Sequence, residues 1–450
     1  MDNANTPYSP TNPRTVDFVV EPEWILPIEP AGLLLTGHAL AVRDGRIEAL
    51  LPTDQMRAQF SCRETFRLPG QLLMPGLVNL HCHSAMSLLR GYADDLPLMR
   101  WLQERIWPAE GALAGKEFVA TGSKLAALEM LRGGTTCVND MYFFPEETAK
   151  AMAGIGMRAT LGMIVIDFPT AYAQSGDDYL AKGLQTRDDY ADNALLSFCL
   201  APHAPYTVSD PLLHRISELS AQLDVPIHIH MHETEQEIAD EVVRTGMRPV
   251  DRLDRLGIIG PRTIAVHAVH LSDTEMALLA RRGAHLAHCP TSNLKLGSGI
   301  ANVPAWERHG ITWGLGTDGA ASNNRLDAWQ ELRHAALLAK GRSHDASALT
   351  AHRVLSAATL GGAKALGLDS KIGSLLPGKA ADMIAVRLDE WIYQPCYDPV
   401  SHLVYVTGRE QVSHVWVAGE LLMANGVLSC ANLTEVLAEA EFWRQKLLQL

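Results

Sequence analysis

Five short apolar runs of this sequence end in histidine or acidic residues, the side chains that bind metal ions and move protons. The endings are NLHCH at 79–83, APH at 201–203, IHIHMHE at 227–233, HAVH at 267–270 and GTDG at 316–319. A lone histidine of this kind is usually a satisfied core or surface residue. Because an unpaired buried polar group costs about 1–3 kcal/mol, five such endings in one chain indicate a shared site.

The first ending carries two histidines with metal-ligand spacing. Side chains alternate across a strand, so His81 and His83 point the same way and can hold one ion, whereas Cys82 faces away. His230 and Asp318 would complete a set of three imidazoles and one carboxylate, with a fifth position left for water. This donor set suits Zn²⁺ or a similar divalent cation.

The third ending leaves a choice among three histidines. His228, His230 and His232 share one face, so spacing alone does not select the ligand. Glu233 lies three residues after His230, where a carboxylate could take a proton from water and pass it to a substrate nitrogen. Alternatively, Glu233 is only an acidic residue at the start of the helix expected at 234–244, where the helix dipole favours negative charge.

Alternating strands and helices would position these endings. Strand-length apolar runs occur at 73–80, 135–139, 159–166, 195–200, 226–231, 263–269, 285–288 and 311–316, and helical patterns at 117–132, 146–153, 211–223, 234–244, 273–282 and 326–339. This alternation predicts a parallel sheet, and eight strands predict a closed (β/α)₈ TIM-type barrel with the endings at one mouth. An open doubly wound sheet is the alternative, but no GxGxxG turn follows the first strand.

The two ends of the chain contain short β-like runs and tight turns instead. Such runs occur at 16–20, 39–42, 46–51, 382–387 and 414–418, and a helical pattern follows at 433–450. Neither end is long enough to form a stable unit alone. We therefore predict one small β-sandwich domain built from residues 1–73 and 372–450, including the terminal helix, with the barrel of residues 74–371 inserted between them.

Composition disfavours several classes of protein. The 450 residues include 51 acidic and 38 basic side chains, and the formal charge of −13 argues against nucleic-acid or membrane partners. No apolar run is long enough to span a membrane, and the polar start MDNANTPYSPTNPR predicts a disordered lead-in rather than a secretory signal. Seven scattered cysteines without a CxxC pair indicate free thiols and a cytoplasmic protein. We also expect a homo-oligomer.

Three further segments have structural interpretations. The loop at 90–95 either covers the mouth of the barrel or is an ordinary solvated loop. Trp101 and Trp107 are expected to serve packing more than to line a substrate pocket. Ser322 and the two asparagines that follow it are expected to cap a helix that begins near Arg325.

The segment MPGLVNLHCHSAMSLLRGYADDLPLMRWLQERIWPAE (74–110) resembles the first barrel strand and following loop of the amidohydrolase superfamily. More narrowly, it is similar to the 5′-methylthioadenosine/S-adenosylhomocysteine deaminases, in the group that includes the triazine hydrolases. Supporting segments are APHAPYT (201–207), HIHMHET (228–234), HAVHL (267–271), HCPTSNLKLGSG (288–299), GTDGAASNN (316–324) and GKAADMIAV (378–386). The match covers most of the chain.

This resemblance implies a role for each matching residue. The metal ligands would be His81, His83, His230 and Asp318, holding one divalent ion per chain, with Zn²⁺ as the first choice. The catalytic residues would be Glu233 as proton shuttle, His267 in contact with the hydrolytic water, and Asp318 as base. The substrate would contact Glu110 through its ribose hydroxyls, and also His203, Glu233 and Asp318.

The implied activity is hydrolytic deamination of a small-molecule nucleoside. 5′-Methylthioadenosine, S-adenosylhomocysteine or adenosine would give the inosine analogue and ammonia, and the preferred 5′ substituent stays open. A first alternative is another aminohydrolase or chlorohydrolase on the same scaffold, acting on guanine, a pterin or a triazine. A second alternative is a non-catalytic metal-binding relative, although such relatives usually lose one or more of the six residues at 81, 83, 230, 233, 267 and 318.

Overall fold

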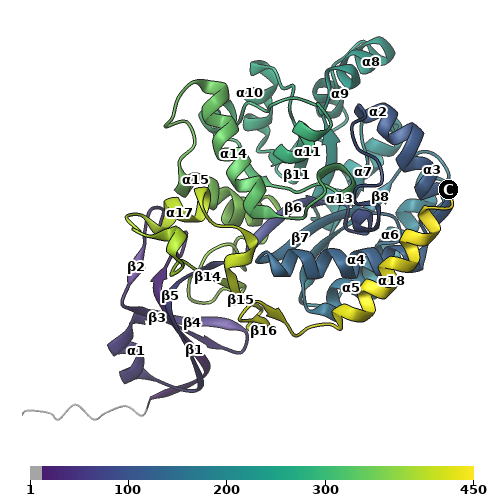
Figure 1. The fold of residues 1–450 in the computed structure, drawn as a ribbon. Coiled ribbons are helices and arrows are strands. Elements are labelled where there is room, and N and C mark those ends of the chain that lie inside the picture. Colours follow the sequence, from purple (N-terminus) through teal and green to yellow (C-terminus); the bar gives the residue numbers. More distant parts are fainter. Residues whose placement is uncertain (1–12) are drawn as a thin grey trace, which may run out of the picture.

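The computed structural model describes residues 13–450 and contains a barrel and a second sheet built from both chain ends (Figure 1). Nearly all of the segment expected to be a disordered lead-in lies outside the described residues. Within the described part, no helix combines the length and the apolar character needed to cross a membrane.

Eight parallel strands form the barrel in chain order, which confirms the predicted (β/α)₈ architecture. They are β6 (Leu77–Cys82), β7 (Thr135–Tyr142), β8 (Arg158–Val165), β9 (Leu196–Pro202), β10 (Ile227–Met231), β11 (Thr263–His267), β12 (His285–His288) and β13 (Thr312–Leu315). The first and last strands meet at the carboxyl end, where the Asp318 N–H donates to the His81 carbonyl at 3.0 Å. The predicted functional residues therefore gather at one end of the barrel.

The first predicted strand, 73–80, divides between two sheets. Its opening residues belong to β5 (Phe60–Pro75) of the other sheet, and the barrel strand begins only at Leu77. Gly76 separates the two strands, and a Cβ there would lie 2.0 Å from Oγ1 of Thr136. The close approach of β7 therefore requires glycine at the point where the chain enters the barrel.

Helices connect the barrel strands, and most of them cover the outside of the barrel. They are α4 (Lys116–Arg132), α5 (Pro145–Ile155), α6 (Gly176–Asp189), α7 (Asp210–Leu223), α8 (Glu235–Thr245), α9 (Pro249–Arg255), α10 (Asp273–Arg282), α11 (Pro290–Lys295), α12 (Val303–Arg308), α13 (Ala320–Asn323), α14 (Ala328–Ser343), α15 (Ala351–Ser356) and α16 (Gly362–Ala365). A long segment after β6 forms η1 (Ser84–Leu89), α2 (Leu98–Trp101), η2 (Leu102–Ile106) and α3 (Trp107–Leu113). This segment supplies part of the cavity described below.

A nine-stranded mixed sheet confirms that both chain ends build one β domain. Its other strands are β1 (Arg14–Ile25), β2 (Leu35–Thr36), β3 (His38–Arg43), β4 (Arg46–Pro52), β14 (Met383–Arg387), β15 (Val412–Val417), β16 (Glu420–Ala424) and β17 (Val427–Leu428). The strand β5 joins the two halves because it pairs with β1 on one side and β14 on the other. The boundaries at 73/74 and 371/372 stay predictions.

A buried ion pair connects the β domain to the barrel. Arg158, the first residue of β8, makes two hydrogen bonds of 2.7 and 3.0 Å to the Asp382 carboxylate just before β14. Both side chains are almost completely buried. Because Arg158 lies at the amino end of its strand, this contact is at the opposite end of the barrel from the gathered histidines.

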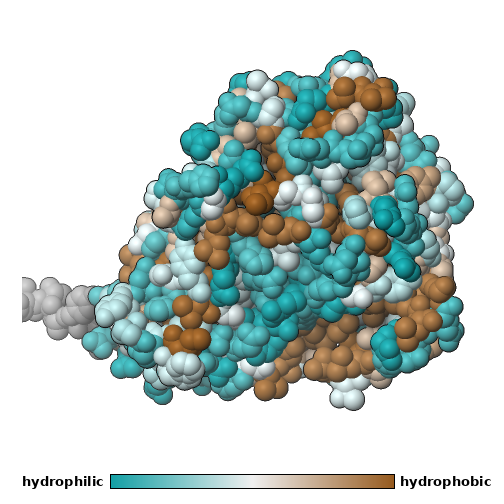
Figure 2. Space-filling model, turned by 45° about the horizontal axis from the view of Figure 1, so that its top comes forward, coloured by the Kyte–Doolittle hydropathy of each residue, from teal (hydrophilic) through white to brown (hydrophobic). Residues whose placement is uncertain are grey.

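The C-terminal helix α18 (Leu433–Leu447) lies along α4 on the barrel (Figure 1). The Trp443 Nε1–H donates to Oγ1 of Thr121, and Glu439 pairs with Lys124. The other side of α18 leaves Leu437 and Phe442 about half exposed. Hydrophobic residues also gather in a few groups on the otherwise mostly hydrophilic face shown in Figure 2.

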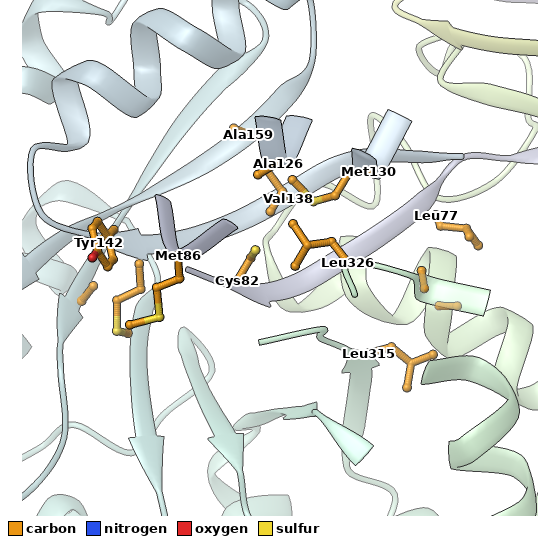
Figure 3. Packing of buried hydrophobic residues seen from close by; sticks show 14 of the residues in the cluster. Leu77, Cys82, Met86, Ala126, Met130, Val138, Tyr142, Ala159, Leu315 and Leu326 are labelled. Atoms are coloured by element: carbon orange, nitrogen blue, oxygen red, sulfur yellow. The ribbon is translucent and has the colours of Figure 1, made fainter. Parts of the chain in front are cut away.

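An apolar layer packs between the barrel strands and the surrounding helices (Figure 3). Val138 of β7 lies near Ala126 and Met130 of α4 in this layer. Cys82 belongs to the same buried cluster, close to Met86. Its side chain therefore lies in the apolar core, as strand parity predicts.

Candidate metal centre and active site

The four predicted metal ligands converge at the carboxyl ends of the barrel strands. His81 lies in β6 and His83 just after it, while His230 lies in β10 and Asp318 follows β13. Nε2 of His81 is 3.3 Å from Nε2 of His230 and 3.2 Å from Oδ1 of Asp318. Nε2 of His83 is 3.3 Å from the same carboxylate oxygen.

His267, at the end of β11, joins this cluster. The candidate ligand atoms of His81, His230 and His267 lie within 4.8 Å of one another, and so do those of His81, His83 and Asp318. The family resemblance implies that His267 contacts the hydrolytic water, and this role stays a prediction. Its ring nitrogen also lies among the possible metal ligands.

Hydrogen bonds at the Nδ1 atoms of His83 and His230 orient these two rings for metal binding. Nδ1 of His83 lies 2.5 Å from the Met141 carbonyl, and Nδ1 of His230 lies 2.7 Å from the His203 carbonyl. A carbonyl only accepts, so Nδ1 carries the hydrogen and Nε2 keeps its lone pair. These lone pairs and a carboxylate oxygen face one small volume, and a divalent cation satisfies all of them. The residues therefore fit a divalent metal ion.

Burial keeps two of the ligand histidines, His81 and His230, neutral. It lowers the pKa of His81 to about 3, and the neighbouring His83 acts in the same direction. Burial also lowers the pKa of His230 well below its usual value. Metal binding requires the deprotonated ring, so these histidines need not lose a proton at neutral pH.

The Asp318 carboxylate divides its two oxygens between different partners. Oδ1 faces the histidines and accepts the Gly319 N–H at 2.8 Å. Oδ2 accepts hydroxyl hydrogens from Ser292 at 2.6 Å and Ser322 at 2.7 Å. Burial alone would raise the pKa of Asp318, but its hydrogen bond with His81 and the proximity of the other histidines of the cluster hold that pKa well below its usual range.

The expected capping role of Ser322 is wrong. The helix α14 begins at Ala328, and Asp327 caps it by accepting the backbone N–H groups of Trp329 and Gln330. Ser322 lies in the short helix α13 and orients the Asp318 carboxylate instead. The sequence did not reveal this because the chain turns back toward the barrel mouth directly after β13.

Glu233 and His267 face each other beside the metal ligands. Oε2 of Glu233 is 3.6 Å from Nε2 of His267, and Asn293 Oδ1 accepts from Nδ1 of His267 at 2.8 Å. The Ser298 hydroxyl donates to the other Glu233 oxygen at 3.2 Å. Burial raises the pKa of Glu233, and a raised pKa helps a carboxyl group to act as both proton donor and proton acceptor. Burial lowers the pKa of His267, but the negative charges of Glu233 and Asp318 outweigh it and raise that pKa overall.

A second, partly buried carboxylate, Glu237, fixes the turn that carries Glu233. Its oxygens accept the backbone N–H groups of His232 at 3.1 Å and Glu233 at 2.8 Å. The backbone of His232 is left-handed there, with φ of 54°. Glu237 and Ser298 were not predicted, although Ser298 lies in a segment on which the family resemblance rests, at 288–299, and Glu237 follows shortly after another, at 228–234.

The structure separates the three histidines in and directly after β10. Of the three, His230 alone joins the ligand cluster. Nε2 of His228 lies 3.0 Å from Nδ1 of His81, on the side of that ring away from the ligand atom Nε2. His232 follows the end of β10, and its ring lies 3.7 Å from the Glu275 carboxylate. Strand parity could not single out His230, because it places His228 and His230 on the same face. It does not apply to His232, which follows the end of β10.

A cavity of about 270 Å³ opens beside the ligand cluster. The predicted residues that line it are His83, Glu110, His203, His230, Glu233, His267 and Asp318. Glu110 is buried, and the Tyr142 hydroxyl donates to it at 2.7 Å. Burial raises the pKa of Glu110 to about 7. Glu110 was identified by resemblance alone, because its place on α3 carries no spacing signal.

The segment after β6 contributes to the cavity through its aromatic residues. Trp101 and Trp107 both line it, so the expectation that they mainly serve packing is too narrow. Trp101 is also buried and donates its Nε1–H to the Ala93 carbonyl. The charged loop at 90–95 is not among the lining residues.

Comparisons with known proteins agree with this arrangement. Residues 72–422 match the model of the amidohydrolase family. A protein from Teredinibacter turnerae named 5-methylthioadenosine/S-adenosylhomocysteine deaminase is 48% identical, over 97% of this chain and 99% of its own. A protein of the same name from Saccharophagus degradans is 46% identical, over 97% and 98%.

Solved structures are also similar to this chain. An adenosine deaminase from Xanthomonas campestris with bound zinc superposes with a TM-score of 0.96 and 48% identity, covering 97% of this chain and all (100%) of that one. An atrazine chlorohydrolase from Arthrobacter aurescens has a TM-score of 0.88 over 95% and 99%, and its 23% identity supports the shared fold only. The chain therefore belongs to the amidohydrolase family, in the branch of the relatives named 5-methylthioadenosine/S-adenosylhomocysteine deaminases.

Proposed function

We propose that this protein is a metal-dependent hydrolase that deaminates 5′-modified adenosines to the inosine analogues and ammonia. One observation carries the proposal: a single cavity is lined by the metal-ligand cluster, by the buried carboxyl of Glu233 and by the buried carboxylate of Glu110. The names of the relatives at 46–48% identity support the same activity. 

His81, His83, His230 and Asp318 would hold one divalent ion, which we propose is Zn²⁺. When bound, such an ion supplies Lewis acidity that lowers the pKa of water from 15.7 to about 7. The neighbouring structure that carries bound zinc supports this choice. The neutral imidazoles of His81 and His230 and the ionised carboxylate of Asp318 have the protonation states that a cation needs.

Three residues would move protons during the reaction. Asp318 and His267 would orient the attacking water and accept its proton. Glu233 would hydrogen-bond the ring nitrogen next to the amino-bearing carbon and protonate it, which makes that carbon electrophilic. The water oxygen would then bond to the carbon, the proton taken from the water would pass to the amino group, and the carbon–nitrogen bond would break to release ammonia. The proton left on the new hydroxyl group would return to Glu233 as the carbonyl forms. The raised pKa of Glu233 supports this shuttle role.

Two lining residues would hold the rest of the nucleoside. Glu110 would accept hydrogen bonds from the ribose hydroxyls, since a buried carboxylate is a strong acceptor with few competing donors. His203 would contact the substrate as a neutral ring, because burial lowers its pKa to about 3. We further propose that the enzyme acts in the cytoplasm as a homo-oligomer, without nucleic-acid or membrane partners.

A substrate panel tests the activity. Purified enzyme is mixed separately with 5′-methylthioadenosine, adenosine, guanine and a chlorinated triazine, while ammonia release and ultraviolet absorbance are followed. The proposal expects ammonia from the nucleosides and a change to the absorbance of the inosine chromophore. Turnover of guanine or of the triazine alone would contradict the proposal and indicate another reaction on this scaffold.

A further inference from the structure

The cavity wall has two parts with different chemistry. The strand ends of the barrel supply the histidines and the acidic residues described above. The remaining wall comes mostly from the α2–α3 segment and from β8 with the loop after it, and these residues are largely apolar. They are Leu98, Trp101, Leu102, Trp107, Gly111, Ala114, Ile164, Ile166, Phe168, Pro169, Thr170, Ala171 and Tyr172.

Glu110 lies within the apolar part of the wall. It shares α3 with Trp107 and Gly111, and its partner Tyr142 is followed in the chain by Phe143, which also lines the cavity. A ribose held by Glu110 would therefore present its 5′ substituent to aromatic and aliphatic side chains. Of these, Trp101 and Leu102 are buried, and Phe168 is 44% exposed at the opening.

No lysine or arginine lines this cavity in the described part of the chain. Three cations of neighbouring segments have other partners. Arg100 makes two hydrogen bonds to the Glu104 carboxylate, and Lys182 pairs with Asp178. Lys295 pairs with Asp94 near the barrel mouth. The only charged side chains in the wall besides histidine are carboxylates.

We propose that this wall selects adenosines with an uncharged, apolar 5′ substituent and discriminates against S-adenosylhomocysteine. The inference rests on the proposed function. A methylthio group gains by leaving water for an apolar surface. The homocysteine tail instead carries an ammonium and a carboxylate, and its carboxylate would meet no cation in the wall.

Three substrates distinguish the effect of the charge of the 5′ substituent from the effect of its size. They are 5′-methylthioadenosine, 5′-butylthioadenosine and S-adenosylhomocysteine, of which the last two have 5′ chains of similar length. We expect kcat/KM for the butylthio compound to exceed that for S-adenosylhomocysteine by about 100-fold, because only the charge differs strongly. Values for these two substrates within about 3-fold of each other would overturn the proposal.

A variant at the opening gives an independent test. Phe168→Arg adds a cation where the side chain is already partly in water, and Phe168→Leu is the matched control. The ratio of kcat/KM for S-adenosylhomocysteine to that for 5′-methylthioadenosine should rise about 10-fold or more with arginine and stay near the wild-type value with leucine. An equal rise in both variants would show that size, not charge, sets the preference.

Failure of this inference differs from failure of the proposed function. If none of the nucleosides releases ammonia, including unsubstituted adenosine, the proposed function is wrong. If all are deaminated and S-adenosylhomocysteine matches the butylthio compound, only the inference about the 5′ wall is wrong.

Discussion

Glu233 is the residue on which the proton movements of the proposed reaction depend. Glu233→Gln keeps the shape and the Ser298 contact but cannot accept and release a proton. We expect kcat to fall by about 10²–10⁴-fold, the usual contribution of general acid–base catalysis, while the metal content stays at one ion per chain. Steady-state kinetics and elemental analysis on the same sample measure both. Turnover near the wild-type rate would remove Glu233 from the shuttle role.

Glu110 gives substrate binding a pH dependence. Its pKa is raised to about 7, so the carboxylate that accepts ribose hydrogens is mostly protonated at pH 6 and mostly ionised at pH 8. The KM for 5′-methylthioadenosine should therefore fall as the pH rises through 7. Glu110→Gln should raise KM and remove most of this fall, which parallel pH series on both proteins would measure. A variant with unchanged KM at pH 8 would place Glu110 outside the substrate site.

The turn that begins helix α8 is a positioning element rather than a source of chemistry. Glu237→Ala leaves the N–H groups of His232 and Glu233 without their acceptor and frees the shuttle residue to move. We expect kcat to fall about 10–100-fold with the metal retained, because small misplacements of a catalytic group are costly. Glu235→Ala, an exposed position on the same helix, is the control and should stay within about 2-fold of wild type. Equal kcat for both variants would contradict the positioning role.

Regular elements were predictable because their periodicity is local. The strand β12 and the helix α10 have the predicted bounds, and most other barrel strands differ from their predicted bounds only by a few residues at their ends. The strand β5 was missed, since its mixed, partly exposed side chains carry no clean alternation. Contacts made by turns after the strands, such as Ser292 and Ser322 on Asp318, depend on where the backbone reverses, and spacing along the chain does not encode that.

At the scale of the whole molecule, the Arg158–Asp382 pair connects the barrel to the β domain. Asp382→Ala leaves a buried guanidinium without its partner, so we expect the free energy of unfolding to fall by about 3–5 kcal/mol. Asp254→Ala, which breaks the more exposed pair with Arg282, should cost less than about 1 kcal/mol. Urea unfolding of the metal-loaded proteins measures both. Folded Asp382→Ala protein should keep the wild-type kcat, because the pair lies at the far end of the barrel.

The central claim is that residues from separate strands of one barrel hold a divalent metal ion that 5′-modified adenosines need for deamination. The most direct measurement follows ammonia release from 5′-methylthioadenosine by the purified protein, first as isolated, then after chelation, and finally after one equivalent of zinc is returned. We expect release, loss and recovery of ammonia formation in turn, with no recovery in a His81→Ala, His230→Ala double variant. Full activity in chelated protein shown by elemental analysis to be free of metal would contradict it.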